Sequence, residues 1–154
     1  MRCPELFIAA YQKNKIIGVV FGYVKKNNAL LGEMAIDKKY RNKGVGSKLL
    51  DLFEKQVIKI SKRKILLGAR EEAEFFYIRR KYKPVLFLQI RYNMLPKNYS
   101  SMSKYRLIKE TNYTDAKRLF FEVEKPSKYL KKRLISLFHA YNGIYLFEKE
   151  LKKQ

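Results

Sequence analysis

Residues 37–47 read DKKYRNKGVGS, and they lead into a segment, residues 44–60, whose apolar residues recur at helical spacing. Gly44 and Gly46 stand where that helix is expected to begin, so the backbone there can approach a ligand closely. The unpaired N–H groups and the dipole of a helix start attract anions, and Arg41 adds a positive charge. The stretch therefore predicts a site for a phosphate or pyrophosphate group.

Two common phosphate-binding motifs do not fit this stretch. A P-loop needs Gly-x-x-x-x-Gly-Lys-Ser/Thr, but Arg41 stands at the first glycine position and Ser47 separates Gly46 from the next lysine. A dinucleotide-binding fingerprint needs a third glycine where Leu49 stands. Both motifs are excluded.

The sequence around this stretch alternates between strand-like and helix-like patterns. Three strand-like segments separated by polar turns come first and predict an antiparallel meander, and a later strand–helix–strand unit over 65–92 predicts a parallel pair of strands. The expected fold class is α+β, with a mixed, mostly antiparallel sheet and flanking helices. The expected strands are 6–11, 16–24, 29–36, 65–69 and 85–92, and the expected helices are 44–60 and 71–81.

The charge of the chain is unusual for its length. The 154 residues hold 35 Lys and Arg against 14 Asp and Glu, which gives a formal net charge of +21. An excess of this size predicts an anionic partner, such as nucleic acid, an anionic membrane surface, an acidic protein or a phosphorylated cofactor.

Other features of composition restrict the setting. The only cysteine, Cys3, excludes an internal disulfide and a multi-cysteine metal site. The longest uncharged apolar run, residues 16–24, is shorter than the ~20 residues of a membrane helix. The first residues, MRCPE, do not resemble a signal peptide. We therefore expect a cytoplasmic protein that binds no metal and no membrane.

The pattern Arg41-x-x-Gly44-x-Gly46 resembles the Arg/Gln-x-x-Gly-x-Gly/Ala signature of the GNAT superfamily of acyl-CoA-dependent N-acetyltransferases. Upstream, residues 34–36 read MAI at the spacing of the family's Leu-Ala-Val strand end. Downstream, residues 69–77 read AREEAEFFY, which is similar to the Ala-Arg-x-x-Ala-x-x-Phe-Tyr stretch of one branch. The resemblance covers about residues 5–92 and implies a GNAT-like fold there.

The resemblance also implies where acetyl-CoA binds. The pantetheine arm would lie beside the third strand like an added strand and would form hydrogen bonds with the backbone of Met34, Ala35 and Ile36. The pyrophosphate would lie against the loop and the first helical turn, which are formed by Arg41, Asn42, Lys43, Gly44, Val45, Gly46 and Ser47. A tight helix entry without a ligand is the structural alternative for this loop.

Two residues are candidates for catalysis. Tyr77 matches the family's helix tyrosine that faces the thioester sulfur, where a phenol can protonate the leaving thiolate. Glu33 is the only carboxylate of the third strand, and it could take a proton from the attacking amine directly or through water. The alternatives are core packing for Tyr77, and a solvated residue or a contact to the substrate ammonium for Glu33.

The function that the resemblance implies is transfer of an acetyl group from acetyl-CoA to a primary amine by direct attack. The basic surface favours an acidic or nucleic-acid-bound acceptor. The alternative is a non-catalytic GNAT-like module whose basic surface binds nucleic acid or an acidic partner.

The last third of the chain departs from the family pattern. Residues 1–92 are expected to form the acetyl-CoA-binding core, residues 93–103 a linker, and residues 104–154 a C-terminal β-α-α-β extension. The family opens with a strand and two helices before the meander, and its two closing strands are here reduced to one, 85–92. The extension resembles the missing opening. It could supply that opening in permuted order or swapped between two chains of a homodimer, or it could be an unrelated appendage or a truncated second repeat. Its expected elements are a strand at 105–109, helices at 114–123 and 126–140, and a strand at 144–147.

Overall fold

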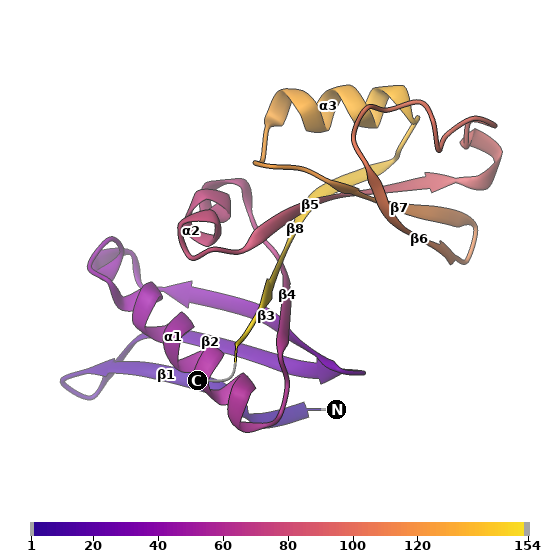
Figure 1. The fold of residues 1–154 in the computed structure, drawn as a ribbon. Helices are drawn as coiled ribbons and strands as arrows, with labels where there is room; N and C mark the ends of the chain where they lie inside the picture. Colours follow the sequence, from indigo (N-terminus) through magenta and orange to yellow (C-terminus); the bar gives the residue numbers. More distant parts are fainter. Residues whose placement is uncertain (1, 153–154) are drawn as a thin grey trace. The chain divides into compact units, whose positions relative to one another are not determined.

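The computed structural model describes residues 2–152 (Figure 1). The chain divides into two compact units. The first comprises the residues up to 67 together with the segment from 149 onward, and the second comprises residues 68–148. Each unit contains part of the sheet and at least one helix.

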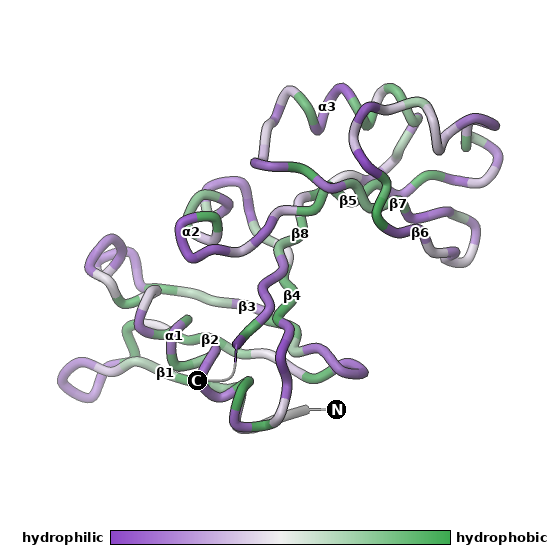
Figure 2. Tube along the Cα trace, in the orientation of Figure 1, coloured by the Kyte–Doolittle hydropathy of each residue, from purple (hydrophilic) through white to green (hydrophobic). Residues whose placement is uncertain are grey.

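The first unit is a meander with one helix packed on it. Strands β1 (Arg2–Gln12), β2 (Lys15–Lys25) and β3 (Asn28–Ile36) pair antiparallel in sequence order. Helix α1 (Val45–Lys59) then leads to β4 (Lys64–Gly68), which pairs parallel with β3. The predicted meander and the predicted first helix are confirmed. Figure 2 shows hydrophilic residues at the turns between the first three strands and hydrophobic residues along the strands.

The core of this unit lies between α1 and the sheet. The buried residues of α1 are Leu49, Leu50, Phe53 and Val57, which recur on one side of the helix. Helix α1 packs on the meander, whose own buried residues include Leu6 and Val20. Burial of each such side chain contributes about 1.5–3 kcal/mol. The ammonium of Lys149 also contacts the Glu54 carboxylate of α1 at 2.8 Å. The position of α1, and with it that of its first turn, is therefore fixed by a well-packed core.

The second unit begins with a short helix and continues as an antiparallel sheet. Its strands lie in the order β8-β5-β7-β6, and the described registers of β5 with β7, of β5 with β8 and of β6 with β7 are antiparallel. Its elements are a 3-10 turn (Glu71–Ala73), α2 (Glu74–Arg79), β5 (Lys83–Arg91), a 3-10 turn (Tyr92–Met94), β6 (Leu107–Tyr113), β7 (Ala116–Glu122), α3 (Lys128–Leu137) and β8 (Asn142–Glu150).

The helix predicted at 114–123 is wrong, because these residues form β7. Thr114 has a φ of +45° and makes the turn of a β6–β7 hairpin. The buried residues Leu119, Phe121 and Val123 then alternate at the period of a strand. The predicted helix at 126–140 is confirmed as α3, where the Ser127 hydroxyl accepts a hydrogen bond from the Leu130 amide at 3.2 Å. The C-terminal extension is therefore β-β-α-β instead of β-α-α-β.

The neighbours of β5 also differ from those expected. β8 pairs antiparallel with β5 from Lys83↔Glu148 to Gln89↔Asn142, and β7 pairs with its other edge. The predicted parallel pairing of β5 with strand 65–69 is therefore wrong. The expectation of a single closing strand is wrong as well, because β8 pairs antiparallel with β5. In the chain, β6, β7 and α3 lie between these two strands.

The position of β6 bears on the missing opening. β6 is the edge strand of the second unit and pairs with β7, whereas a permuted opening would place the strand at 105–109 beside the meander. A permuted opening within one chain is therefore wrong, and exchange between two chains stays a prediction.

The predicted linker, residues 93–103, lies within the second unit, between β5 and β6. In the part of the chain that the structure describes, no helix is long and apolar enough to span a membrane.

Candidate functional site

The predicted cofactor strand, β3, has an irregular and partly open edge. The register with β2 pairs Phe21 with Glu33 and Gly22 with Leu31, so Gly32 is the extra residue of a β-bulge. On the other side, β4 pairs with β3 only at residues 28–30 within the described chain. Residues 31–36 therefore present backbone groups along an edge where an extended ligand could pair as an added strand.

Short hydrogen bonds hold the loop after β3 in place. The Asp37 carboxylate accepts a hydrogen bond from the Lys39 amide at 3.0 Å and thereby caps a 3-10 turn (Lys38–Tyr40). This bond is the main reason that the pKa of Asp37 is lowered, and the ammonium of Lys15 at 3.4 Å lowers it further. The Nε of Arg41 donates to the carbonyl of Ile36 at 3.1 Å. The loop is thus tied back to the end of the strand that it leaves.

The start of α1 is open and cationic. Gly44 is the N-cap residue with a φ of +82°, and no side chain caps the helix there. A Cβ built on Gly44 would have no atom within 4 Å, so space lies free above the helix start. The first turn holds no acidic residue, and the exposed Arg41 and Lys43 precede it. The ammonium of Lys43 stands 5.6 Å from the centre of the Tyr40 ring.

The first unit therefore brings together the residues predicted to bind the cofactor. The open edge at Met34, Ala35 and Ile36 leads directly into the loop and helix start of residues 41–47. A linear ligand with amide groups could bind along this edge, with an anionic group at its end placed at the helix start. Glu33 is exposed and adjoins the bulge at Gly32.

Tyr77 belongs to α2 in the second unit. Its side chain is only 5% exposed and packs among aromatic rings. The nearest ring centres are those of Phe76 at 5.1 Å, Tyr82 at 5.6 Å and Phe147 at 5.8 Å. Burial raises the pKa of Tyr77 to about 12, so its phenol is protonated at neutral pH. Packing fixes the ring, and the neutral hydroxyl is a possible proton donor.

An ion-pair cluster joins the 3-10 turn before α2 to α3. The sequence pattern did not predict this cluster. The Glu71 carboxylate contacts Lys128 at 2.8 Å and Lys131 at 2.7 Å. Hydrogen bonds from these two lysines lower the pKa of Glu71 to about 2. The nearby Glu74 is 7% exposed, and burial raises its pKa. No local sequence signal could reveal this cluster, because its members come from distant parts of the chain.

The Glu71 cluster predicts a pH-dependent contribution to stability. A carboxylate whose pKa is lower in the folded state stabilises the fold above its unfolded pKa, about 4.5, and loses that effect as pH falls toward 2. We expect Glu71→Gln to lower the melting temperature at pH 7, with a difference from wild type that shrinks below pH 5. Thermal unfolding across pH 2–7 measures this. The matched control is Glu72→Gln, since Glu72 makes no ion pair among the described residues, and an equal effect of both variants would contradict the prediction.

The described residues contain no group of three or more His, Cys, Asp or Glu side chains that could hold a metal ion. The features of the candidate site in the first unit are a strand edge, a helix start and the exposed carboxylate of Glu33.

Comparisons with known proteins identify the family and the fold. The family model described as "Acetyltransferase (GNAT) domain" matches residues 4–84. No curated protein sequence matches the chain. Among solved structures, a protein of Pyrococcus horikoshii described as an acetyltransferase matches with a TM-score of 0.52 and 13% identity, over 97% of this chain and 75% of that one. This likeness extends the shared fold beyond the residues that the family model covers.

Two further solved structures are similar at lower TM-scores. A GNAT-family acetyltransferase of Staphylococcus aureus Mu50 has a TM-score of 0.46 and 23% identity, over 75% of this chain and 66% of that one. An aminoglycoside 6'-N-acetyltransferase solved with coenzyme A has a TM-score of 0.47 and 14% identity, over 80% and 77%. The family model covers more than half of the sequence, including the bulged strand, the glycine-containing loop and α2. The chain belongs to the GNAT family of acetyltransferases.

Proposed function

We propose that the protein is an N-acetyltransferase that uses acetyl-CoA and acetylates a primary amine by direct attack. The observation that carries this proposal is the continuous path in the first unit from the open edge of β3 to the uncapped start of α1. This path offers backbone groups for an extended, amide-containing arm and then a positive helix end for a pyrophosphate. Membership of the GNAT family supports the same reading.

The residues that would hold acetyl-CoA follow from this geometry. The backbone of Met34, Ala35 and Ile36 would pair with the pantetheine arm. The amides of residues 42–47 would bind the pyrophosphate, with charge from Arg41 and Lys43. The open space above Gly44 leaves room for the phosphates to approach these amides. Membership of the GNAT family of acetyltransferases supports this type of co-substrate.

The proposed chemistry needs two proton transfers. A bond forms between the amine nitrogen and the acetyl carbon, and the bond between that carbon and the thioester sulfur breaks. Glu33 would take the proton that the amine must lose, directly or through water. Tyr77 would give its proton to the leaving thiolate, since its phenol is protonated at neutral pH. The acceptor that the net charge of +21 favours is acidic or nucleic-acid-bound, and the compartment that we propose is the cytoplasm.

Ligand-dependent stability and acetyl transfer test this function. At a concentration of 100 times its Kd, acetyl-CoA should stabilise the folded protein by about 2.7 kcal/mol, which corresponds to a rise in melting temperature of several degrees. Thiol release from acetyl-CoA should depend on an added amine, measured over a panel of amine-bearing small molecules, peptides and nucleic-acid-bound proteins. Pantetheine, which lacks the phosphates of acetyl-CoA, should give a much smaller rise in melting temperature. The absence of any shift at 1 mM acetyl-CoA, measured at about physiological salt, would overturn the proposal.

A further inference from the structure

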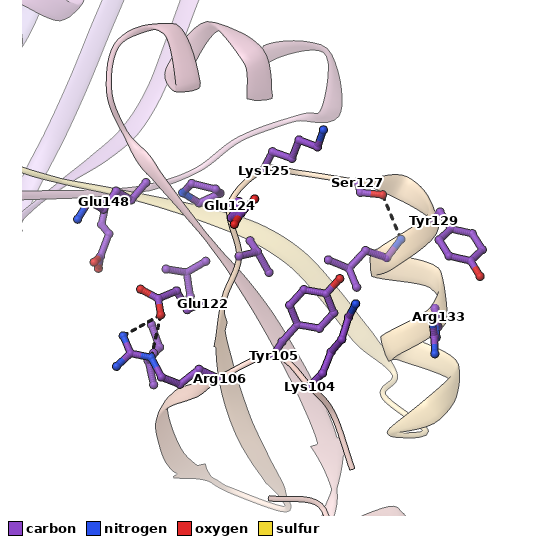
Figure 3. Close-up of a pocket in the computed structure, with 16 residues that line it drawn as sticks. Lys104, Tyr105, Arg106, Glu122, Glu124, Lys125, Ser127, Tyr129, Arg133 and Glu148 are labelled. Atoms are coloured by element: carbon purple, nitrogen blue, oxygen red, sulfur yellow. Dashed lines mark hydrogen bonds and ion pairs between the residues drawn. The ribbon is translucent and has the colours of Figure 1, made fainter. Parts of the chain in front are cut away.

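The second unit contains a pocket that the transferase chemistry does not use. Its volume is about 910 Å³, within the size range of pockets that bind small molecules. It lies between the first residues of β5, the segment 104–108, the end of β7 and the first half of α3 (Figure 3). Most of its lining belongs to the segment between β5 and β8, which lies beyond the residues matched by the family model.

The pocket carries more positive than negative charge. Five cationic and three carboxylate side chains line it, which are Lys83, Lys104, Arg106, Lys125 and Arg133, and Glu122, Glu124 and Glu148. One side is locally neutral, because the guanidinium of Arg106 pairs with the Glu122 carboxylate at 2.7 Å. The excess of two cations over carboxylates matches the charge of a phosphate monoester dianion.

The excess charge is concentrated on the side next to α3. Figure 3 shows Lys104 and Arg133 there, away from Glu122 and Glu148. Neither of these two cations has a carboxylate within ion-pair distance in the described part of the chain. The nearby Ser127 hydroxyl already caps α3. A guanidinium next to an ammonium is a favourable pair for a phosphate, since the guanidinium can donate two parallel hydrogen bonds.

An aromatic ring stands beside these cations. Tyr105 lies in the middle of the pocket in Figure 3, and the ammonium of Lys104 is 5.6 Å from its ring centre. Tyr105 is partly exposed and lines the pocket. Nucleobases stack on aromatic rings of this kind with little dependence on base identity.

We propose that this pocket binds a nucleoside monophosphate, with its phosphate between Lys104 and Arg133 and its base on the ring of Tyr105. The site is distinct from the helix start at Gly44, which belongs to the first unit. The proposal does not depend on acetyl transfer.

Calorimetry with three probes separates the contributions to binding. AMP should bind, ribose 5-phosphate should bind more weakly, and adenosine, which lacks the phosphate, should lose at least about tenfold in affinity. Arg133→Ala should weaken AMP binding at least about tenfold. Tyr105→Leu should weaken AMP and leave ribose 5-phosphate unchanged. No heat of binding at 10 mM AMP would overturn the proposal.

Two controls separate this site from other basic surfaces. Lys132 is an exposed cation on the same helix that does not line the pocket, so Lys132→Ala should change AMP affinity less than about twofold. Equal losses in Lys132→Ala and Arg133→Ala would mean non-specific attraction and would overturn the proposal. Gly44→Val should still bind AMP. If Gly44→Val loses AMP while Arg133→Ala retains it, the ligand occupies the start of α1 and the proposal is wrong.

Discussion

Replacement of Gly44 by valine is expected to abolish binding of acetyl-CoA, with a loss of affinity of at least about a hundredfold. The new side chain would fill the space through which phosphates reach the helix amides. The φ of +82° also costs a β-branched residue about 1–2 kcal/mol, which favours a backbone different from the one that presents these amides. Titration calorimetry with acetyl-CoA measures the loss. Acetyl transfer should fall in parallel.

A second variant at the same position separates obstruction from backbone strain. Asparagine tolerates a left-handed conformation better than other side chains, so Gly44→Asn should keep a melting temperature near that of wild type. Its side chain still enters the open space, and acetyl-CoA affinity should fall by about tenfold or more. Wild-type affinity in a folded Gly44→Asn or Gly44→Val protein would show that the pyrophosphate does not bind at this helix start.

Replacement of Tyr77 by phenylalanine is expected to lower kcat by about a hundredfold, the smaller end of the range for a general acid. The phenyl ring keeps the contacts with Phe76, Tyr82 and Phe147, so the fold and the KM for acetyl-CoA should change little. With a pKa near 12, the hydroxyl remains a proton donor throughout the usual assay range, and Tyr77 should cause no loss of rate between pH 7 and pH 10.

Tyr82→Phe is the matched control for this variant. Tyr82 is 2% exposed and packs against the same ring, but it has no assigned part in the chemistry. Removal of its hydroxyl should affect stability without a comparable fall in kcat. If Tyr77→Phe retains wild-type kcat, or if both variants lose kcat equally, the role of Tyr77 is packing and the proposed acid is another group.

Burial of Tyr77 also predicts how stability changes at alkaline pH. Its folded pKa of about 12 lies above the ordinary value of 10.0, so the folded state holds the proton after the unfolded state has lost it. The unfolded state is then favoured as pH rises from about 10 to 12, and stability falls across that window. Tyr77→Phe should show a smaller fall than wild type in the same unfolding series.

Much of the first unit could be predicted because its signals are local. Period-two runs separated by polar turns indicated the meander, and the spacing of Leu49, Phe53 and Val57 indicated α1. The bulge at Gly32 had no comparable signal, because it depends on the register between two strands. The prediction of a helix at 114–123 was wrong because, in so short a segment, the apolar residues fit both the helical period and the strand period. Pairing with β5 stabilises the strand.

The sequence by itself determined the strand–loop–helix unit around residues 29–60, and with it the candidate acetyl-CoA site and the family. Its determinants lie next to one another in the chain: alternating apolar residues, two glycines and the basic residues between them. Only the tertiary structure decided that β8 pairs with β5, that Glu71 meets Lys128 and Lys131, and that residues 83–85, 104–108 and 122–133 enclose a cationic pocket. The reason is that these contacts join residues tens of positions apart, and their energies arise from burial and charge proximity that exist only after the chain has folded.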